Sequence, residues 1–107
     1  MTVTPFAQAV YHLTKKVPQG RVTTYKEIAK ALHCRAYQAV GQALARNPFA
    51  PIVPCHRVVK SNGTIGGFGG KTRGKKIKKK IRILEKEGIK FTGQKIRNFK
   101  KVFLSIA

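Results

Sequence analysis

The chain has 107 residues, enough for one small domain over 1–107, and it carries 23 lysines and arginines against three acidic residues, for a formal net charge of +20. No apolar run approaches the roughly 18 residues that a membrane span needs, and the N-terminus lacks the basic and apolar stretches of a signal peptide. The composition therefore excludes a membrane-spanning protein and indicates a polyanionic partner. Nucleic acid is the first candidate, a membrane surface the second, and a merely solvated basic face is the alternative.

The first predicted helix begins at Thr4 and Pro5, which are typical of an N-cap and a first helical residue. Apolar residues then recur at helical spacing and end before Pro18: Phe6, Val10, Leu13 and Val17. A second helix is predicted from Thr24, which forms a capping box with Glu27, to about His33.

A third helix is predicted over 36–46, where Asn47 and Pro48 end it. Its face is rich in small residues, namely Ala39, Gly41, Ala43 and Ala45. Two helices joined by a tight turn, the second lined with small side chains, indicate a helix-turn-helix over about 24–46. An ordinary helical hairpin with closely packed alanines is the alternative.

The second half of the chain contains turn signals and a basic stretch. Asn62-Gly63 predicts a small hairpin that joins 58–60 to 64–65. A basic helix and tail are predicted over about 71–107, with an apolar helical stripe that ends at Gly88 and with the lysines on a solvated face. Residues 89–96 suit a hairpin around Thr92-Gly93, and 99–106 suit a closing amphipathic helix. The expected fold is mainly α: a winged-helix-like, helix-turn-helix DNA-binding domain with four or five helices and a small β-hairpin.

Cys55 is the candidate nucleophile, in an active-site loop over 54–58. His56 and Arg57 follow it, and cationic or basic neighbours favour the reactive thiolate over the thiol. A small buried cysteine is the commoner fate, so the pair alone is a weak signal. Cys34 and Cys55 form no disulfide framework and match no zinc spacing, which indicates an intracellular protein with reduced thiols.

Five blocks of sequence carry a resemblance to a known family. They are 20–25, 39–48, 52–59, 66–70 and 84–88, and the most specific is the run Pro54-Cys55-His56-Arg57-Val58. In this order they resemble the C-terminal, active-site domain of the O6-alkylguanine-DNA alkyltransferase family, the methylated-DNA–protein-cysteine methyltransferases.

The resemblance implies single-turnover DNA repair by a monomer. The helix-turn-helix would enter the minor groove of double-stranded DNA, and the O6-alkylguanine would be flipped into a pocket. Cys55 would take the alkyl group as a stable thioether, with no metal and no cofactor. The expected location is the cytoplasm and nucleoid, or the nucleus in a eukaryote.

The resemblance also implies roles for four residues besides Cys55. His56 would accept the thiol proton through a water, and Glu87 would orient His56, as in a catalytic triad. Tyr25 would donate to guanine N3, and Asn47 would brace the turn beside the cysteine. Each has a simpler interpretation: core packing for Tyr25, a helix cap for Asn47, and a lysine partner for Glu87.

Further positions match the family's contacts with the lesion and the DNA. Ala39 and Gly41 would allow close approach to DNA, and the Val58 carbonyl would read the exocyclic amine of guanine. Backbone N–H groups at Gly69 would face the guanine oxygen, because a family serine is glycine here and Phe68 replaces the preceding tyrosine. Arg57 would be a structural brace.

Besides the substitutions at Phe68 and Gly69, two departures from the family pattern leave alternatives open. Gln38 stands where the family has the arginine that fills the gap left by the flipped base, and Arg35, one turn earlier, is a partial substitute. The family's N-terminal domain is absent, as it is in the alkyltransferase-like proteins, which have tryptophan in place of the cysteine and bind lesions without repairing them. The alternatives are therefore a non-catalytic lesion-binding protein and, third, an architectural basic protein. Cys34 matches no family role and is expected to fill the helix-turn-helix corner.

Overall fold

The computed structural model describes residues 3–68 and 73–106. Within these ranges the elements are α1 (Pro5–Thr14), β1 (Thr23–Thr24), α2 (Tyr25–Ala31), α3 (Tyr37–Ala45), a 3-10 turn (Cys55–Arg57), β2 (Val58–Val59), α4 (Lys75–Lys86), β3 (Phe91–Thr92), β4 (Lys95–Ile96) and α5 (Phe99–Val102). None of the helices in these ranges has the length and apolar character that crossing a lipid bilayer would require. The predicted mainly helical fold is confirmed.

The first two helices begin where the sequence predicts. Thr4 Oγ1 accepts a hydrogen bond from the Ala7 amide at 3.1 Å, and Thr24 Oγ1 accepts one from the Glu27 amide at 3.0 Å. The Thr24 half of the predicted capping box is therefore present. The Glu27 carboxylate instead accepts from Ser105 Oγ at 3.2 Å, which ties the start of α2 to the C-terminal segment.

Helices α2 and α3 form the predicted helix-turn-helix. The turn begins with a hydrogen bond from the Cys34 amide to the Ala29 carbonyl at 3.0 Å, and Cys34 packs half-buried against the core at this corner. Helix α1 lies against α3, where the Tyr11 hydroxyl donates to the Ala43 carbonyl at 2.6 Å. This buried hydrogen bond joins the first helix to the second helix of the helix-turn-helix.

The hairpin predicted at 58–65 is wrong. Residues Val58 and Val59 pair in parallel with Thr23 and Thr24, and not with 64–65. The Asn62-Gly63 turn does form, closed by Gly63 N–H to Lys60 O and Lys60 N–H to Thr64 O, both at 3.0 Å. Both valines are fully buried, which is typical of a parallel strand covered on two faces rather than of a hairpin strand.

The hairpin around Thr92-Gly93 is confirmed, as the antiparallel pair β3–β4. It packs on the segment before it, because Ile65 N–H donates to Gln94 O and Ile96 N–H donates to Gly63 O, both at 2.9 Å. The closing helix α5 is shorter than the sequence predicted. Beyond it the chain runs extended beside β1, where Val22 N–H donates to Val102 O at 2.9 Å and Leu104 N–H donates to Val22 O at 2.8 Å.

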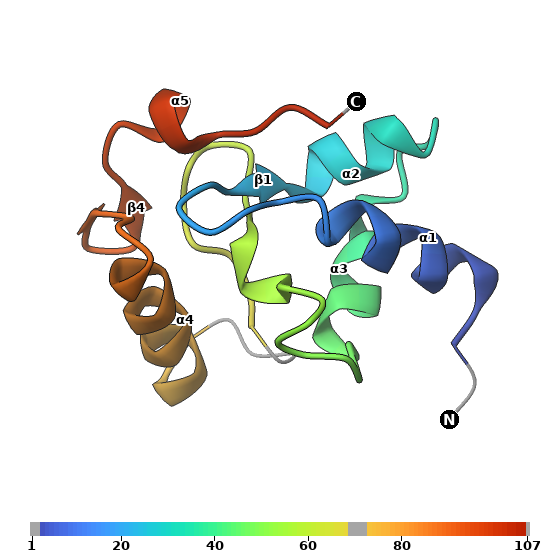
Figure 1. The fold of residues 1–107 in the computed structure, drawn as a ribbon, viewed down its shortest axis with the longest axis horizontal. Coiled ribbons are helices and arrows are strands. Elements are labelled where there is room, and N and C mark those ends of the chain that lie inside the picture. The colour runs from blue at the N-terminus through green and yellow to red at the C-terminus, as the bar shows by residue number, and fades with distance from the viewer. Residues whose placement is uncertain (1–2, 69–72, 107) are drawn as a thin grey trace.

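Strand β2, the yellow-green arrow in Figure 1, runs between α4 on one side and the helices α1 and α3 on the other. The core forms two clusters, and β2 contributes one residue to each. Val58 packs among residues of α1, α2 and α3, whereas Val59 packs toward α4 and the β3–β4 hairpin. Successive residues of a strand point to opposite sides, so two residues suffice to join both clusters. The 3-10 turn that carries Cys55 comes directly before β2, so the packing of β2 in both clusters also positions this turn.

Candidate active site

The loop that carries Cys55 is braced by Asn47. The Asn47 side chain donates from Nδ2 to the Val53 carbonyl at 2.8 Å and accepts from the Phe49 amide at Oδ1 at 2.9 Å. The Cys55 amide also donates to the Val53 carbonyl, at 2.8 Å. These bonds fix the backbone that leads into the 3-10 turn.

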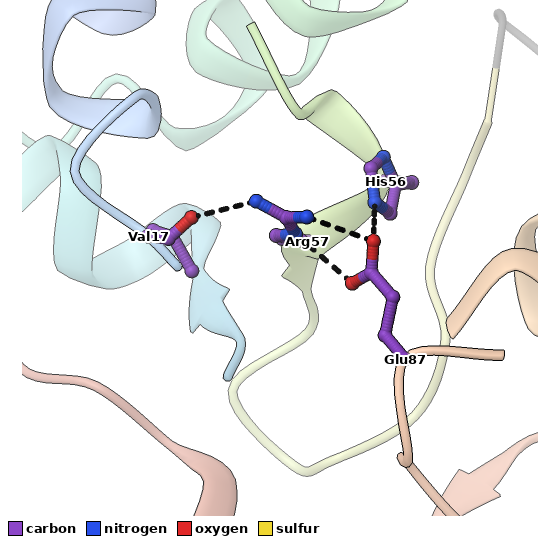
Figure 2. A network of polar contacts seen from close by, with 4 residues as sticks. All are labelled: Val17, His56, Arg57 and Glu87. Atoms are coloured by element: carbon purple, nitrogen blue, oxygen red, sulfur yellow. Dashed lines mark hydrogen bonds and ion pairs between the residues drawn. The ribbon is translucent and has the colours of Figure 1, made fainter. Parts of the chain in front are cut away.

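Glu87 lies at the C-terminal end of α4 and accepts three hydrogen bonds (Figure 2). His56 Nε2 lies 2.9 Å from Glu87 Oε2, and Arg57 donates to Oε1 from Nε at 2.9 Å and to Oε2 from Nη2 at 2.8 Å. Arg57 also donates from Nη1 to the Val17 carbonyl at 3.0 Å. The predicted base and its orienting acid are therefore in contact, and Arg57 is the brace between them and the loop after α1.

The electrostatics of this network favour a neutral histidine beside an ionised glutamate. Burial lowers the pKa of His56 and outweighs the opposing effect of Glu87. Burial acts to raise the pKa of Glu87, but hydrogen bonds from Arg57 and His56 hold it below its ordinary value. With Nε2 turned to the carboxylate, the neutral ring carries its proton there and leaves Nδ1 as a free acceptor.

Cys55 lines a cavity of about 700 Å³ together with residues from four other parts of the chain. The lining includes Tyr25, Gln38 and Gly41, which were all predicted, and it extends along α3 to Ala45. Two predicted DNA contacts, Arg35 and Ala39, are exposed on the helix-turn-helix and are not among the described residues that line the cavity. Val58 is fully buried and is not among them either. Gly69 falls outside the described residues.

Tyr25 is placed as a hydrogen-bond donor in this cavity. Its hydroxyl reaches the Gly67 carbonyl at 3.4 Å, a long contact that leaves the hydroxyl available to a better acceptor. Burial raises the pKa of Tyr25 to about 12, so the phenol keeps its proton at neutral pH. The protonated phenol can therefore donate a hydrogen bond within the cavity, and its donation to guanine N3 stays a prediction.

Lys80 is the site residue that the sequence analysis missed. It lies on α4, its side chain is fully buried, and its Nζ donates to three carbonyls: Val58 at 2.7 Å, Ile65 at 2.7 Å and Gly67 at 2.8 Å. The ammonium also lies 5.9 Å from the centroid of the Tyr25 ring. One cation therefore binds the strand after Cys55 to the glycine-containing wall of the cavity.

The expectation that the α4 lysines are solvated is wrong at this one position. A signal was present, because Lys80 lies at helical spacing between Ile77 and Leu84, on the stripe that faces the core. Periodicity thus placed the residue on the buried face, whereas the length of the lysine run suggested a uniform exposed face.

Gly66 is required where the backbone passes Tyr25. Its φ is +71°, and a Cβ there would lie 3.1 Å from both Cε2 and Oη of Tyr25. We expect Gly66→Ala to lower the free energy of unfolding by about 1–2 kcal/mol, from the left-handed backbone and the contact together. Gly41→Ala is the matched control, since a Cβ at Gly41 meets nothing within 4 Å and helical alanine is favoured over glycine. Urea unfolding of both variants checks this; equal stabilities would contradict it.

The helix-turn-helix, with a cavity that its second helix lines together with Cys55, is the architecture of a DNA-binding domain. Residues 5–89 match the family model described as "6-O-methylguanine DNA methyltransferase, DNA binding domain", and the chain belongs to this family.

A curated relative and two solved structures agree with this family assignment. A methylated-DNA–protein-cysteine methyltransferase of Saccharolobus islandicus is 45% identical over 86 residues, 80% of this chain and 52% of that protein, so the chain spans about half the length of this curated relative. The structure of Mycobacterium tuberculosis OGT in complex with DNA matches with a TM-score of 0.72 and 39% identity, over 80% of this chain and 51% of that one. S. pombe Atl1 in complex with damaged DNA containing O6-carboxymethylguanine matches with a TM-score of 0.79 and 28% identity, over 97% and 98% of the two chains.

Proposed function

We propose that the chain repairs DNA by moving an alkyl group from the O6 atom of guanine to Sγ of Cys55, once per molecule. The observation that carries the proposal is the shared cavity, in which Cys55, Tyr25 and the second helix of the helix-turn-helix meet. The chain would correspond to the C-terminal, active-site domain of the longer relatives. The names of those relatives support the same reaction.

Double-stranded DNA is the proposed partner, with α3 in the minor groove. Gln38 and Gly41 would lie at the base stack, where Gln38 can fill the space of the flipped guanine and donate hydrogen bonds. The exposed cations of α4 would add attraction to phosphates that is independent of sequence. These cations are Lys75, Lys76, Lys78, Lys79, Arg82 and Lys86.

The chemistry requires a proton acceptor and an in-line displacement. His56 Nδ1 would accept the Cys55 thiol proton through a water, while Glu87 keeps the ring oriented from Nε2. The thiolate then forms a bond to the alkyl carbon, and the carbon–O6 bond breaks with its electron pair moving to the guanine. Tyr25 would donate to N3 and offset the charge that develops there. A thioether does not hydrolyse, so the molecule acts once.

Lys80 holds the backbone on which the family's base contact would depend. The Val58 carbonyl accepts from Lys80 Nζ and has a second lone pair, but Val58 is buried outside the described lining, so its contact with the exocyclic amine of guanine rests on the resemblance. Lys80 is a positioning residue in this scheme, because it acts through the carbonyls that it holds.

The proposal is tested by intact mass spectrometry after incubation with a duplex that carries one O6-methylguanine. We expect the protein to gain the mass of one methyl group and to stop at one. The variants Cys55→Ala and Cys34→Ala form a matched pair, since both remove a half-buried thiol. Only Cys55→Ala should abolish the gain; a gain that persists in Cys55→Ala would refute the proposal.

Lesion binding without transfer is the second candidate, favoured by the match to Atl1 over nearly the whole of both chains. It predicts tight binding to the O6-methylguanine duplex over an undamaged duplex, with no change in protein mass. Binding that ignores the lesion and disappears as salt is raised would instead indicate a protein held by charge alone.

A further inference from the structure

One wall of the cavity is built by polar side chains to which no role has been given above. Lys60, Thr64 and Gln94 line the same cavity as Cys55. Gln94 belongs to the β3–β4 hairpin, which lies beyond residue 89, where the match to the family model ends. The hairpin is fixed in place by a bridge between Thr64 and Lys95 and by the hydrogen bond from Ile65 N–H to Gln94 O at 2.9 Å. The C-terminal segment thus adds a wall to the cavity.

Lys60 lies next to the residue that would hold the guanine. A Cβ at Gly66 would lie 3.3 Å from Lys60 Cγ and 3.1 Å from Tyr25 Oη, so the stem of Lys60 and the Tyr25 hydroxyl flank the same glycine. The residue is exposed overall, so its flexible ammonium can extend along the cavity wall.

The charge around this cavity is positive. The chain has only three acidic residues, Glu27, Glu85 and Glu87, and none of them is among the described residues that line the cavity. Lys80 lies behind the wall, and its Nζ is already used by three backbone carbonyls. Among the described residues that line the cavity, Lys60 is therefore the cation whose charge can meet a ligand.

We propose that Lys60 and Gln94 form a specificity site for O6 substituents that carry a negative charge, with a carboxymethyl group as the representative. The guanine would bind beside Tyr25, and the substituent would extend past Cys55 toward Lys60. An ammonium and a carboxylate attract one another, and the Gln94 amide adds a donor for the second carboxylate oxygen. This inference rests on the proposed function only in that the cavity receives the alkylated guanine.

The test compares two duplexes that differ in charge and hardly in shape, one with O6-carboxymethylguanine and one with the neutral O6-carbamoylmethylguanine. Affinities are measured with Cys55→Ala, so the readout does not depend on transfer. We expect the carboxymethyl duplex to bind more tightly, and Lys60→Gln to reduce this preference by about three- to fivefold, the range of a partly exposed ion pair. Gln94→Glu should reverse the preference, and raised salt should weaken it.

Lys16→Gln is the matched control, because it removes the same charge from an exposed position outside the described lining. It should weaken binding of both duplexes equally. Equal affinity of the parent protein for the two duplexes, or the same loss of preference in Lys16→Gln and Lys60→Gln, would overturn the inference. Methyl transfer by the chain with Cys55 intact is measured in parallel, so that a failure of the repair chemistry is seen separately from a failure of this specificity.

Discussion

Replacing Glu87 by alanine is expected to lower the free energy of unfolding by about 3 kcal/mol and to abolish most alkyl transfer. The carboxylate accepts three hydrogen bonds, and its side chain is only 11% exposed. Its removal leaves the Arg57 guanidinium, 17% exposed, without its anionic partner, and it leaves His56 free to rotate. The loss of transfer follows because Nδ1 would no longer face the thiol in a fixed orientation.

Glu85→Ala is the matched control for this change. Glu85 lies on the same helix, is exposed, and carries the same charge, so we expect its replacement to change stability by less than about 0.5 kcal/mol. Urea unfolding and single-turnover transfer measured on both variants decide the point. If the folded Glu87→Ala protein transfers the alkyl group as fully as the parent, Glu87 has no part in the mechanism and its role is structural alone.

The second large effect is a pH-dependent one and concerns Lys80. Burial lowers the pKa of Lys80 from 10.5 to about 7, so between these values the unfolded chain binds a proton that the folded chain does not. The stability is therefore expected to rise with pH from about 7 upward, by up to about 1.4 kcal/mol per pH unit, and this gain is lost as pH falls through 7.

Lys80→Met isolates this contribution, because methionine has a similar length and does not titrate. The substitution also removes the hydrogen-bond donor of the Val58, Ile65 and Gly67 carbonyls. Each carbonyl that gains no other donor lowers the free energy of unfolding by about 1–3 kcal/mol. We therefore expect the variant to be less stable than the parent, with a gap that widens between pH 7 and pH 9.5. Urea midpoints at pH 6, 7, 8 and 9 measure this.

A constant gap would mean that the ammonium keeps its proton throughout. The geometry offers a reason for that outcome, since three carbonyl acceptors need three N–H donors and a neutral amine has only two. The measurement thus distinguishes a lysine dominated by burial from one dominated by its hydrogen bonds.

The local elements were predictable where a short-range signal decides them. The caps at Thr4 and Thr24, the small-residue helix α3 and the Thr92-Gly93 hairpin all depend on residues a few positions apart, and the structure confirms each. The pairing of β2 was not predictable in this way. Its partner β1 lies 35 positions earlier in the register that joins Thr23 to Val58, and a strong turn signal at Asn62-Gly63 favoured the nearer segment.

The same distinction between short-range and long-range signals applies to the residues of the candidate site. The sequence placed Cys55, His56 and Glu87 in one constellation through the resemblance, and the structure brings His56 and Glu87 into contact. Helical periodicity could have placed Lys80 on the buried face of α4, but it could not have identified the three backbone carbonyls that Lys80 binds. Gln94 could not be identified at all, because it reaches the cavity through the packing of a hairpin on 63–65. Any residue has a backbone carbonyl, so the residue types along the sequence do not indicate which carbonyls accept a hydrogen bond.

The two-residue ladder between β1 and β2 sets the spacing within the site. A slip of one residue along β2 would shift the chain by about 3.3 Å and would exchange Val58 and Val59 between the two halves of the core. Such a slip would move Cys55 away from Tyr25, which directly follows β1. A slip in either direction would bring Arg57 or Lys60 to a position that a buried valine now occupies, so burial of the two valines sets the register during folding. The distance between sulfur and phenol is therefore fixed by the fold itself, and the proposed DNA ligand would have to adapt to it.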